Sequence, residues 1–223
     1  MYGLKMFIRE HENLMKLLAF IYRLFGMNSL KGKKGLNVYW SGSFCKRFKI
    51  VNYGMGNTIV IKKGCRFRDC KIEIYGDNNR IVIENDCVGH ELEIWCSEGS
   101  CVEIGEHSHF AGKSHLAATE GKKISIGKKC LFANEIVFRT GDSHSIIDLR
   151  GNRMNFAKDI KVEDHVWIGQ CVTVLKGTEI GENCIIGSNS LLTGKSYDRN
   201  CVIAGSPAKI IKKDVTWTPE LVY

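Results

Sequence analysis

Aliphatic residues return at every sixth position between residues 160 and 212, and Gly often follows them directly. In the segment VLKGTEIGENCIIGSNSLL, residues 174–192, these positions are Val174, Ile180, Ile186 and Leu192. An amphipathic helix repeats at three or four residues, and a continuous strand alternates at two. A period of six fits neither, so the pattern predicts short extended segments that are separated by regularly placed turns.

A six-residue unit cannot bury its own hydrophobic face, so copies of it must stack on one another. We predict a solenoid in which each unit forms one flat side and three sides complete a coil of 18 residues. The first and fifth positions of each unit point inward, while polar residues, Gly and Asn occupy the corners, where positive φ angles are often needed. Ile168, Ile186 and Ala204 are expected to form one buried column, and Val174 and Leu192 another.

A looser form of the pattern precedes this region. Its aliphatic positions Ile61, Ile83, Ile104 and Ile126 lie 21 or 22 residues apart, which indicates coils with small corner insertions. We therefore expect the solenoid domain to span residues 36–213. Four of the ten cysteines follow these aliphatic positions at a fixed spacing of four residues: Cys65, Cys87, Cys130 and Cys184. They are predicted to be small buried hydrophobic residues in a reducing cytosol, since no Cys-x-x-Cys pair indicates a zinc or redox site.

The first 35 residues have a different pattern. Apolar side chains recur at helical spacing from Phe7 to Phe25, so we predict a short amphipathic helix over residues 6–25, followed by a linker. This helix is too short and too interrupted by charge to span a bilayer. It is expected to cap the open end of the solenoid or to pack on a neighbouring subunit. The alternative is peripheral contact with a membrane surface, helped by Lys31, Lys33 and Lys34. Residues 214–223 are assigned to a C-terminal tail.

The formal net charge of +8 favours anionic partners. The lysines are scattered and no nucleic-acid-binding motif occurs, so nucleic acid is not an expected partner. No signal peptide is visible in the first ten residues. We therefore expect a cytoplasmic location, at the inner face of the membrane if the N-terminal helix binds lipid.

The repeat is interrupted between residues 139 and 159 by a long polar segment that contains His144. A long polar loop inside a regular array is a candidate functional site. Imidazole accepts protons near neutral pH, whereas an alcohol needs a base to become a good nucleophile. His144 is therefore a candidate general base.

The hexads, the segment GDSHSIIDLR at residues 141–150 and the segment VEDHVWIG at residues 162–169 resemble the hexapeptide-repeat acyltransferases, in particular sugar and capsular-polysaccharide O-acetyltransferases. The resemblance implies an all-β solenoid of left-handed parallel β-helix type and a homotrimer with active sites between subunits. It also implies acetyl-CoA as co-substrate and a saccharide acceptor, which we expect to be a surface polysaccharide or its precursor. His144 would deprotonate the acceptor hydroxyl. Asp142 would orient the imidazole, although Asp148 or a main-chain carbonyl could serve instead.

Other positions acquire roles from the same resemblance. Those expected to bind acetyl-CoA are Trp167, Gly169, Gln170, Ser188, Thr193, Lys195, Lys209 and Lys212. Trp167 would lie near the thioester, and the lysines would meet the adenosine phosphates. His115 and Arg150 are assigned to the acceptor. His109 and His115 occupy equivalent places in successive hexads, but a zinc site needs a third ligand that the sequence does not identify, so no metal is expected.

Two alternatives stay open at this level. The same fold and base could acetylate the nitrogen of an amino sugar or a drug. A different class is a non-catalytic β-helix scaffold, which would have little need for the polar interruption or for the cationic residues near the C-terminus.

Overall fold

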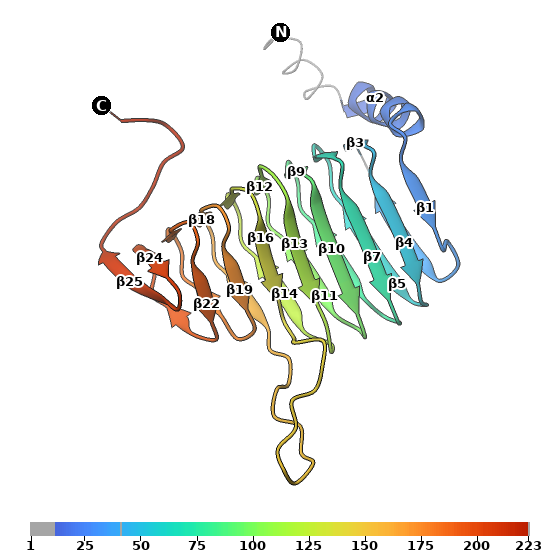
Figure 1. The fold of residues 1–223 in the computed structure, drawn as a ribbon. Coiled ribbons are helices and arrows are strands. Elements are labelled where there is room, and N and C mark those ends of the chain that lie inside the picture. The colour runs from blue at the N-terminus through green and yellow to red at the C-terminus, as the bar shows by residue number, and fades with distance from the viewer. Residues whose placement is uncertain (1–11, 41, 223) are drawn as a thin grey trace.

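The computed structural model describes residues 12–40 and 42–222, which form a left-handed parallel β-helix with a short helix at one end (Figure 1). The chain visits three parallel sheets in turn, and we call them sheets A, B and C. Sheet A contains β1 (Ser29–Lys31), β4 (Lys49–Tyr53), β7 (Lys71–Tyr75), β10 (Leu92–Ser97), β13 (Ser114–Ala118), β16 (Ile136–Arg139), β19 (Thr173–Leu175) and β22 (Leu191–Thr193).

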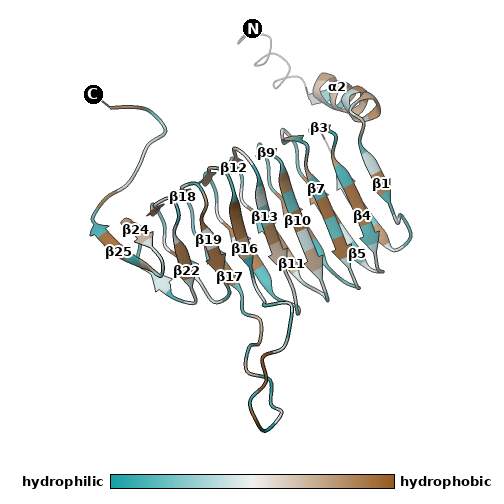
Figure 2. Cartoon of the chain, in the orientation of Figure 1, coloured by the Kyte–Doolittle hydropathy of each residue, from teal (hydrophilic) through white to brown (hydrophobic). Residues whose placement is uncertain are grey.

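The other two sheets complete each coil. Sheet B contains β2 (Leu36–Trp40), β5 (Asn57–Ile61), β8 (Arg80–Ile83), β11 (Cys101–Ile104), β14 (Lys123–Ile126), β17 (Ile160–Val162), β20 (Glu179–Ile180) and β23 (Ser196–Tyr197). Sheet C contains β3 (Phe44–Lys46), β6 (Arg66–Arg68), β9 (Val88–His90), β12 (His109–Phe110), β15 (Leu131–Phe132), β18 (Trp167–Ile168), β21 (Ile185–Ile186), β24 (Cys201–Gly205) and β25 (Ala208–Lys213). Hydrophobic and hydrophilic residues alternate along many of these strands (Figure 2), because one face of each sheet packs inside the coil.

The strand registers confirm most of the predicted columns. Val174 pairs with Leu192, and Ile61, Ile83, Ile104 and Ile126 lie in register along sheet B. These side chains and the four hexad cysteines are buried, and none of the ten cysteines forms a disulfide. Burial raises the pKa of the Cys130 thiol to about 12, which keeps that thiol protonated at neutral pH.

One predicted column is wrong at its last member. Ile186 pairs with Ile203, which is fully buried, and Ala204 is only half-buried. The cause is the corner between sheets A and B. It has three residues after β19, at positions 176–178, but only two after β22, at positions 194–195. The shorter corner advances the next inward position by one residue.

The two ends of the coil differ from each other. Helix α2 (Glu12–Phe25) lies beside the first coil, where Met15 and Ala19 are buried; Phe7 and His11 of the predicted helix lie outside the described residues. Strand β1 pairs with β4, so sheet A already begins within the segment that we had assigned to helix and linker. At the other end, β25 turns back antiparallel to β24. No helix in residues 12–40 and 42–222 is long and apolar enough to cross a bilayer.

Candidate active site

The long polar loop is the main interruption of the coil in the described part of the chain. It leaves sheet A after Arg139 and returns to sheet B at Ile160 (Figure 1). An isolated bridge between Ile147 and Arg153 makes it a hairpin. At its tip, the Asp148 carboxylate accepts hydrogen bonds from the backbone N–H groups of Arg150 and Asn152, at 2.8 and 2.9 Å. The loop is therefore an ordered projection.

Asn155 fixes the segment that carries His144. Asn155 is only 7% exposed, and both the nitrogen and the oxygen of its side-chain amide make hydrogen bonds. Nδ2 donates to the carbonyl oxygen of His144 at 2.7 Å and to Oδ2 of Asp142 at 2.8 Å, while Oδ1 accepts from the N–H of Ile146 at 2.7 Å. One side chain thus holds residues 142–146 against the returning strand of the hairpin.

Asp142 is the second anchor of the loop. Its carboxylate accepts a hydrogen bond from the Lys176 ammonium, which lies in the next corner between sheets A and B. This contact, together with the Asn155 amide, lowers the pKa of the Asp142 carboxyl, although partial burial opposes the shift. Asp142 therefore reaches His144 through Asn155 and the main chain. Its role in orienting the imidazole stays a prediction.

Two arginines tie the loop to the outer face of the coil. Arg139 donates to the Ser143 hydroxyl at 2.5 Å, directly before His144. Arg153 donates to Glu120 at 2.6 Å and lies over the ring of Phe156. His144 itself is exposed at the base of the loop, so its imidazole is accessible to a substrate from outside the coil.

Six of the eight positions predicted to bind acetyl-CoA lie on sheet C or beside it. Trp167 heads a row across this sheet that continues through Ile185 and Val202 to Lys212. The next positions, Gly169, Gly187 and Ala204, form a parallel row of small residues, and Ala204 pairs with Lys209. Gln170 and Ser188 lie in the adjoining corner, where the Gln170 N–H donates to the Ser188 hydroxyl at 3.2 Å. Together the two rows form a strip on the outer face of sheet C that runs from the exposed Trp167 to Lys209 and Lys212. The strip crosses three strand spacings, which is about 14 Å.

The remaining two positions lie elsewhere. Thr193 ends β22 and Lys195 follows it, at the corner between sheets A and B from which the loop also projects. The predicted cofactor residues therefore fall on opposite edges of sheet A, and the chain alone does not bring Lys195 to the lysines of β25. This separation of Lys195 from the sheet C residues follows from the fold. The three sheets form a three-sided prism, and successive corners of one coil lie on different edges of that prism.

The two predicted acceptor residues are also apart. His115 lies on the outer face of sheet A, where its Nδ1 is 3.2 Å from Oε2 of Glu93 and its strand is hydrogen-bonded to β16. Arg150 lies at the exposed tip of the hairpin. Sheet A thus places His115 beside the strand that leads into the loop, whereas Arg150 projects outward.

Nothing in the sequence pattern singles out Asn155 or Lys176. Asn155 stands among apolar loop residues, and Lys176 occupies a hexad corner where lysine is ordinary. Only the meeting of loop and corner in three dimensions shows that they hold the His144 segment. A covariation between positions 142, 155 and 176 would be the signal in related sequences.

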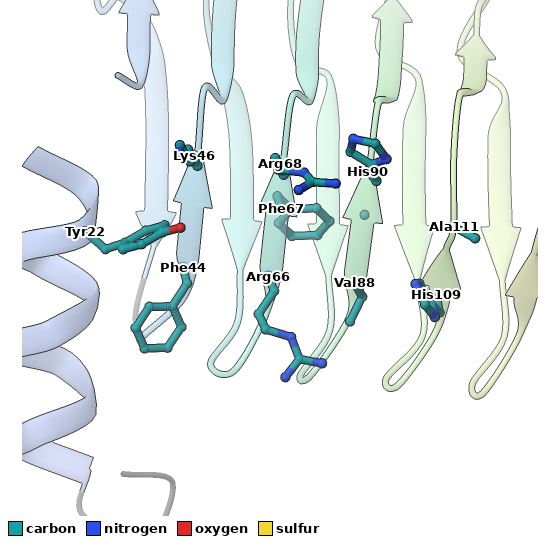
Figure 3. Close-up of a pocket in the computed structure, with 11 residues that line it drawn as sticks. Tyr22, Phe44, Lys46, Arg66, Phe67, Arg68, Val88, His90, His109 and Ala111 are labelled. Atoms are coloured by element: carbon teal, nitrogen blue, oxygen red, sulfur yellow. The ribbon is translucent and has the colours of Figure 1, made fainter. Parts of the chain in front are cut away.

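A separate pocket of about 360 Å³ lies on sheet C near helix α2 (Figure 3). Helix α2 lies at the N-terminal end of the coil, far from the loop (Figure 1). Tyr22 and Phe44 line it together with basic residues of β3, β6, β9 and β12. Burial and the nearby Arg66 guanidinium lower the pKa of His109 in this pocket. None of the predicted site residues lines it. Residues 12–40 and 42–222 contain no group of three or more His, Cys, Asp or Glu side chains arranged to hold a metal ion.

Comparison with known proteins agrees with the fold. Residues 159–194 match the family described as bacterial transferase hexapeptide (six repeats). A crystal structure of the polysialic acid O-acetyltransferase OatWY superimposes with a TM-score of 0.82 and 32% sequence identity, covering 88% of this chain and 93% of that one. The chain belongs to the hexapeptide-repeat acetyltransferase family.

Curated members of this family match over shorter stretches. A polysialic acid O-acetyltransferase of Escherichia coli O1:K1 / APEC is 32% identical over 56% of this chain and 40% of its own length. A protein of the same name from Neisseria meningitidis is 36% identical over 50% of this chain and 53% of its own length. The chain therefore spans about half the length of the curated relatives that it matches.

Proposed function

We propose that the protein is an acetyl-CoA-dependent O-acetyltransferase that acts on a saccharide hydroxyl, with His144 as general base. The observation that carries this proposal is an exposed histidine held at the base of the loop that interrupts an otherwise regular coil. Family membership supports the reaction class, since the relatives named above are O-acetyltransferases of a polysaccharide.

The proposed reaction is a direct transfer. Neutral His144 imidazole accepts the proton of the acceptor hydroxyl while the hydroxyl oxygen attacks the carbonyl carbon of the acetyl thioester. A C–O bond forms and the carbonyl oxygen becomes an oxyanion, which a backbone N–H can stabilise. The C–S bond then breaks, and the leaving thiolate takes the proton from the imidazolium. The products are an acetyl ester and the free thiol of CoA.

The anchored loop supplies the orientation that this chemistry requires. Asn155 holds the His144 carbonyl, and Asp142 joins the same segment to Lys176. A catalytic group that is held in place avoids the entropic cost of finding its geometry in each turnover. The chain thus contributes a pre-positioned base.

Acetyl-CoA is proposed to lie along sheet C. Gly169, Gly187 and Ala204 keep the strip beside Trp167 low, and Lys209 and Lys212 lie at its far end, where they would pair with phosphates. The family often has arginine where this chain has Lys209 and Lys212, and lysine keeps the charge while losing bidentate geometry.

We propose that the active unit is a homotrimer. The loop and the strip on sheet C lie on different edges of one chain, so a neighbouring subunit is needed to bring them together. The hairpin also exposes several large apolar side chains that a partner subunit would cover: Ile146, Ile147, Leu149, Met154 and Phe156. We place the enzyme in the cytoplasm, where acetyl-CoA is made. Peripheral membrane contact through α2 stays a prediction.

Replacing His144 with alanine tests the proposal. We expect thiol release from acetyl-CoA in the presence of polysialic acid to fall by about 10²- to 10⁴-fold, the range for loss of a general base. Acetyl-CoA affinity, measured by titration calorimetry, should stay near that of the wild-type protein. The matched control is His107→Asn, because His107 is an exposed histidine at a distant corner with a φ of 60° that asparagine tolerates.

Each contrary outcome has a distinct meaning. Near-normal turnover in His144→Ala would remove His144 from its role. Transfer only to amino sugars would replace O-acetylation by N-acetylation. A wild-type protein with no saturable heat of acetyl-CoA binding and no thiol release would be a scaffold.

A further inference from the structure

Three aromatic side chains lie against one another on the outer face of sheet A. The rings of Tyr53 and Tyr75 stack with centroids 4.9 Å apart and an interplanar angle of 25°. Trp95 continues the row, 5.5 Å from Tyr75 and tilted by 40°. Tyr53 is 60% exposed, and Tyr75 and Trp95 also remain accessible. We call this surface the aromatic platform.

The platform lies on the same sheet and toward the same edge as the candidate active site. Tyr53 ends β4, Tyr75 ends β7 and Arg139 ends β16, and these strands are parallel members of sheet A (Figure 1). The polar loop that carries His144 leaves the sheet immediately after Arg139. The platform and the base of the loop are therefore two parts of one edge of the prism.

The strand register connects the platform with the base of the loop. The register places Ala117 between Trp95 and Arg139 in one row on the outer face. Ala117 is nevertheless buried, so neighbouring side chains close over its methyl group and no charged side chain projects at that point. Arg139 in turn donates to Ser143, which precedes His144. The row thus leads from Trp95 to Arg139 beside the proposed base, while Tyr53 and Tyr75 lie in the neighbouring row of the same sheet.

We propose that the aromatic platform binds successive units of a saccharide chain whose reacting hydroxyl lies at His144. This inference rests on the proposed function and specifies its acceptor as an extended oligosaccharide or polysaccharide. The C–H groups of a sugar ring are favourably placed against the electron-rich face of an aromatic ring. Tyrosine and tryptophan also present large contact areas at low conformational cost.

The polar neighbours of the platform favour a saccharide over an apolar partner. Lys71 pairs with Glu73 at 2.7 Å and approaches Glu93 at 3.5 Å, and His115 contacts Glu93. An apolar partner would desolvate these groups without replacing their hydrogen bonds to water, whereas sugar hydroxyls can donate and accept on both sides. His115, which we assigned to the acceptor, lies in this set.

The dimensions require a chain rather than a single sugar. Four strand spacings separate β16 from β4, which is about 19 Å along the coil. One monosaccharide at His144 cannot reach Tyr53 or Tyr75. The platform should therefore affect the use of long acceptors and leave the use of short ones nearly unchanged.

The test combines Tyr53→Ala and Tyr75→Ala in one variant and compares it with Tyr39→Ala. Tyr39 is a matched control, since it is 61% exposed but lies on sheet B. Affinity electrophoresis in gels that contain polysialic acid measures binding without catalysis, and it is run for the wild type and for His144→Ala as well. Thiol release is then measured with long polysialic acid and with a disaccharide of the same units.

We expect polysialic acid to retard the wild type, His144→Ala and Tyr39→Ala. The double variant should bind about tenfold more weakly, the scale on which truncated aromatic anchors weaken an interface. KM should rise for the long acceptor only, with unchanged kcat and unchanged acetyl-CoA affinity. A Tyr53→Phe/Tyr75→Phe variant keeps the rings and should restore binding.

Three results would overturn the platform. The double variant could be retarded like the wild type, the wild type could migrate freely, or the double variant could lose its oligomeric mass, which would assign the rings to a subunit contact. Failure of the proposed function would look different from these three results. Polysialic acid would then retard the wild-type protein, but the protein would transfer no acetyl group.

Discussion

Removal of the Asn155 side chain tests the proposal that the anchored loop positions His144 for the reaction. Asn155→Ala deletes hydrogen bonds to Ile146, Asp142 and His144, all between 2.7 and 2.8 Å. At about 1 kcal/mol of net stabilisation for each bond, the anchored loop loses about 3 kcal/mol relative to open forms. If the anchored and open forms of the loop were equally populated in the wild type, that loss would decrease the anchored population by about 100-fold. Water can replace part of the bonding at the surface, so we expect kcat to fall by about 10- to 100-fold.

The readouts separate positioning from folding. The coil carries its own hydrophobic core, so the thermal midpoint of Asn155→Ala should stay close to that of the wild type. Acetyl-CoA affinity should not change, and hydrogen exchange should speed up at the Ile146 amide. Asn155→Asp keeps the acceptor for that amide but loses both donated bonds and faces Asp142 with a like charge, so it should be no better than alanine. Asn152→Ala removes one exposed 3.1 Å bond at the tip of the same loop and should change kcat by no more than about twofold.

This reasoning would be refuted in two ways. An unchanged kcat in Asn155→Ala would show that the loop does not need its anchor. A fall in the thermal midpoint that accounts for the whole loss of activity would show that Asn155 serves the fold and not the position of His144.

Two further predictions follow from the charges. Lys209→Glu should weaken acetyl-CoA binding, and the difference in affinity from the wild type should become smaller as the salt concentration rises. The control Lys63→Glu, on a distant coil, should leave the affinity unchanged. An unchanged affinity in Lys209→Glu would move the phosphate site away from β25. The pKa of Asp142 is lowered in the folded chain, so its anchoring is fully present above the unfolded pKa of about 3.9 and is lost only as pH falls through the lower folded pKa. Protection of residues 146–154 from proteolysis should therefore be the same at pH 7 and pH 5, and a loss of protection within that window would assign the anchor to another group.

The hexad pattern predicted the coil well because each unit repeats the same local environment. An aliphatic residue at the first position and a small or β-branched one at the fifth are enough to specify inward columns, as Val174, Leu192 and the buried Cys184 show. The pattern failed at Ala204, because the corner before it is one residue shorter and corners carry no hydrophobic signal. The start of sheet A at Ser29 was not predicted for a different reason, since a three-residue strand is too short to show alternation.

The site was predictable only in part. His144 could be selected as a candidate because a histidine in a polar interruption is conspicuous against a periodic background, and its role as a base stays a proposal. Its supports could not, since Asn155 and Lys176 meet Asp142 only after the hairpin folds back over the next corner. The aromatic platform was equally hidden. Tyr53 and Tyr75 are 22 residues apart, and only the parallel register places them side by side.

The position of the loop explains how the fold accommodates it. The loop does not disturb the register of sheet B. Strand β14, before the loop, pairs with β17, after it, through Ile124 with Ile160 and Ile126 with Val162. A hydrogen bond from the Lys158 N–H to the Thr140 carbonyl, 2.9 Å long, closes the base. The core columns therefore pass the insertion without a gap, and the entropic cost of closing a long loop grows only slowly with its length. A corner of the coil can thus carry the proposed base, its anchors and an adjacent binding edge while the stability of the solenoid rests on other residues.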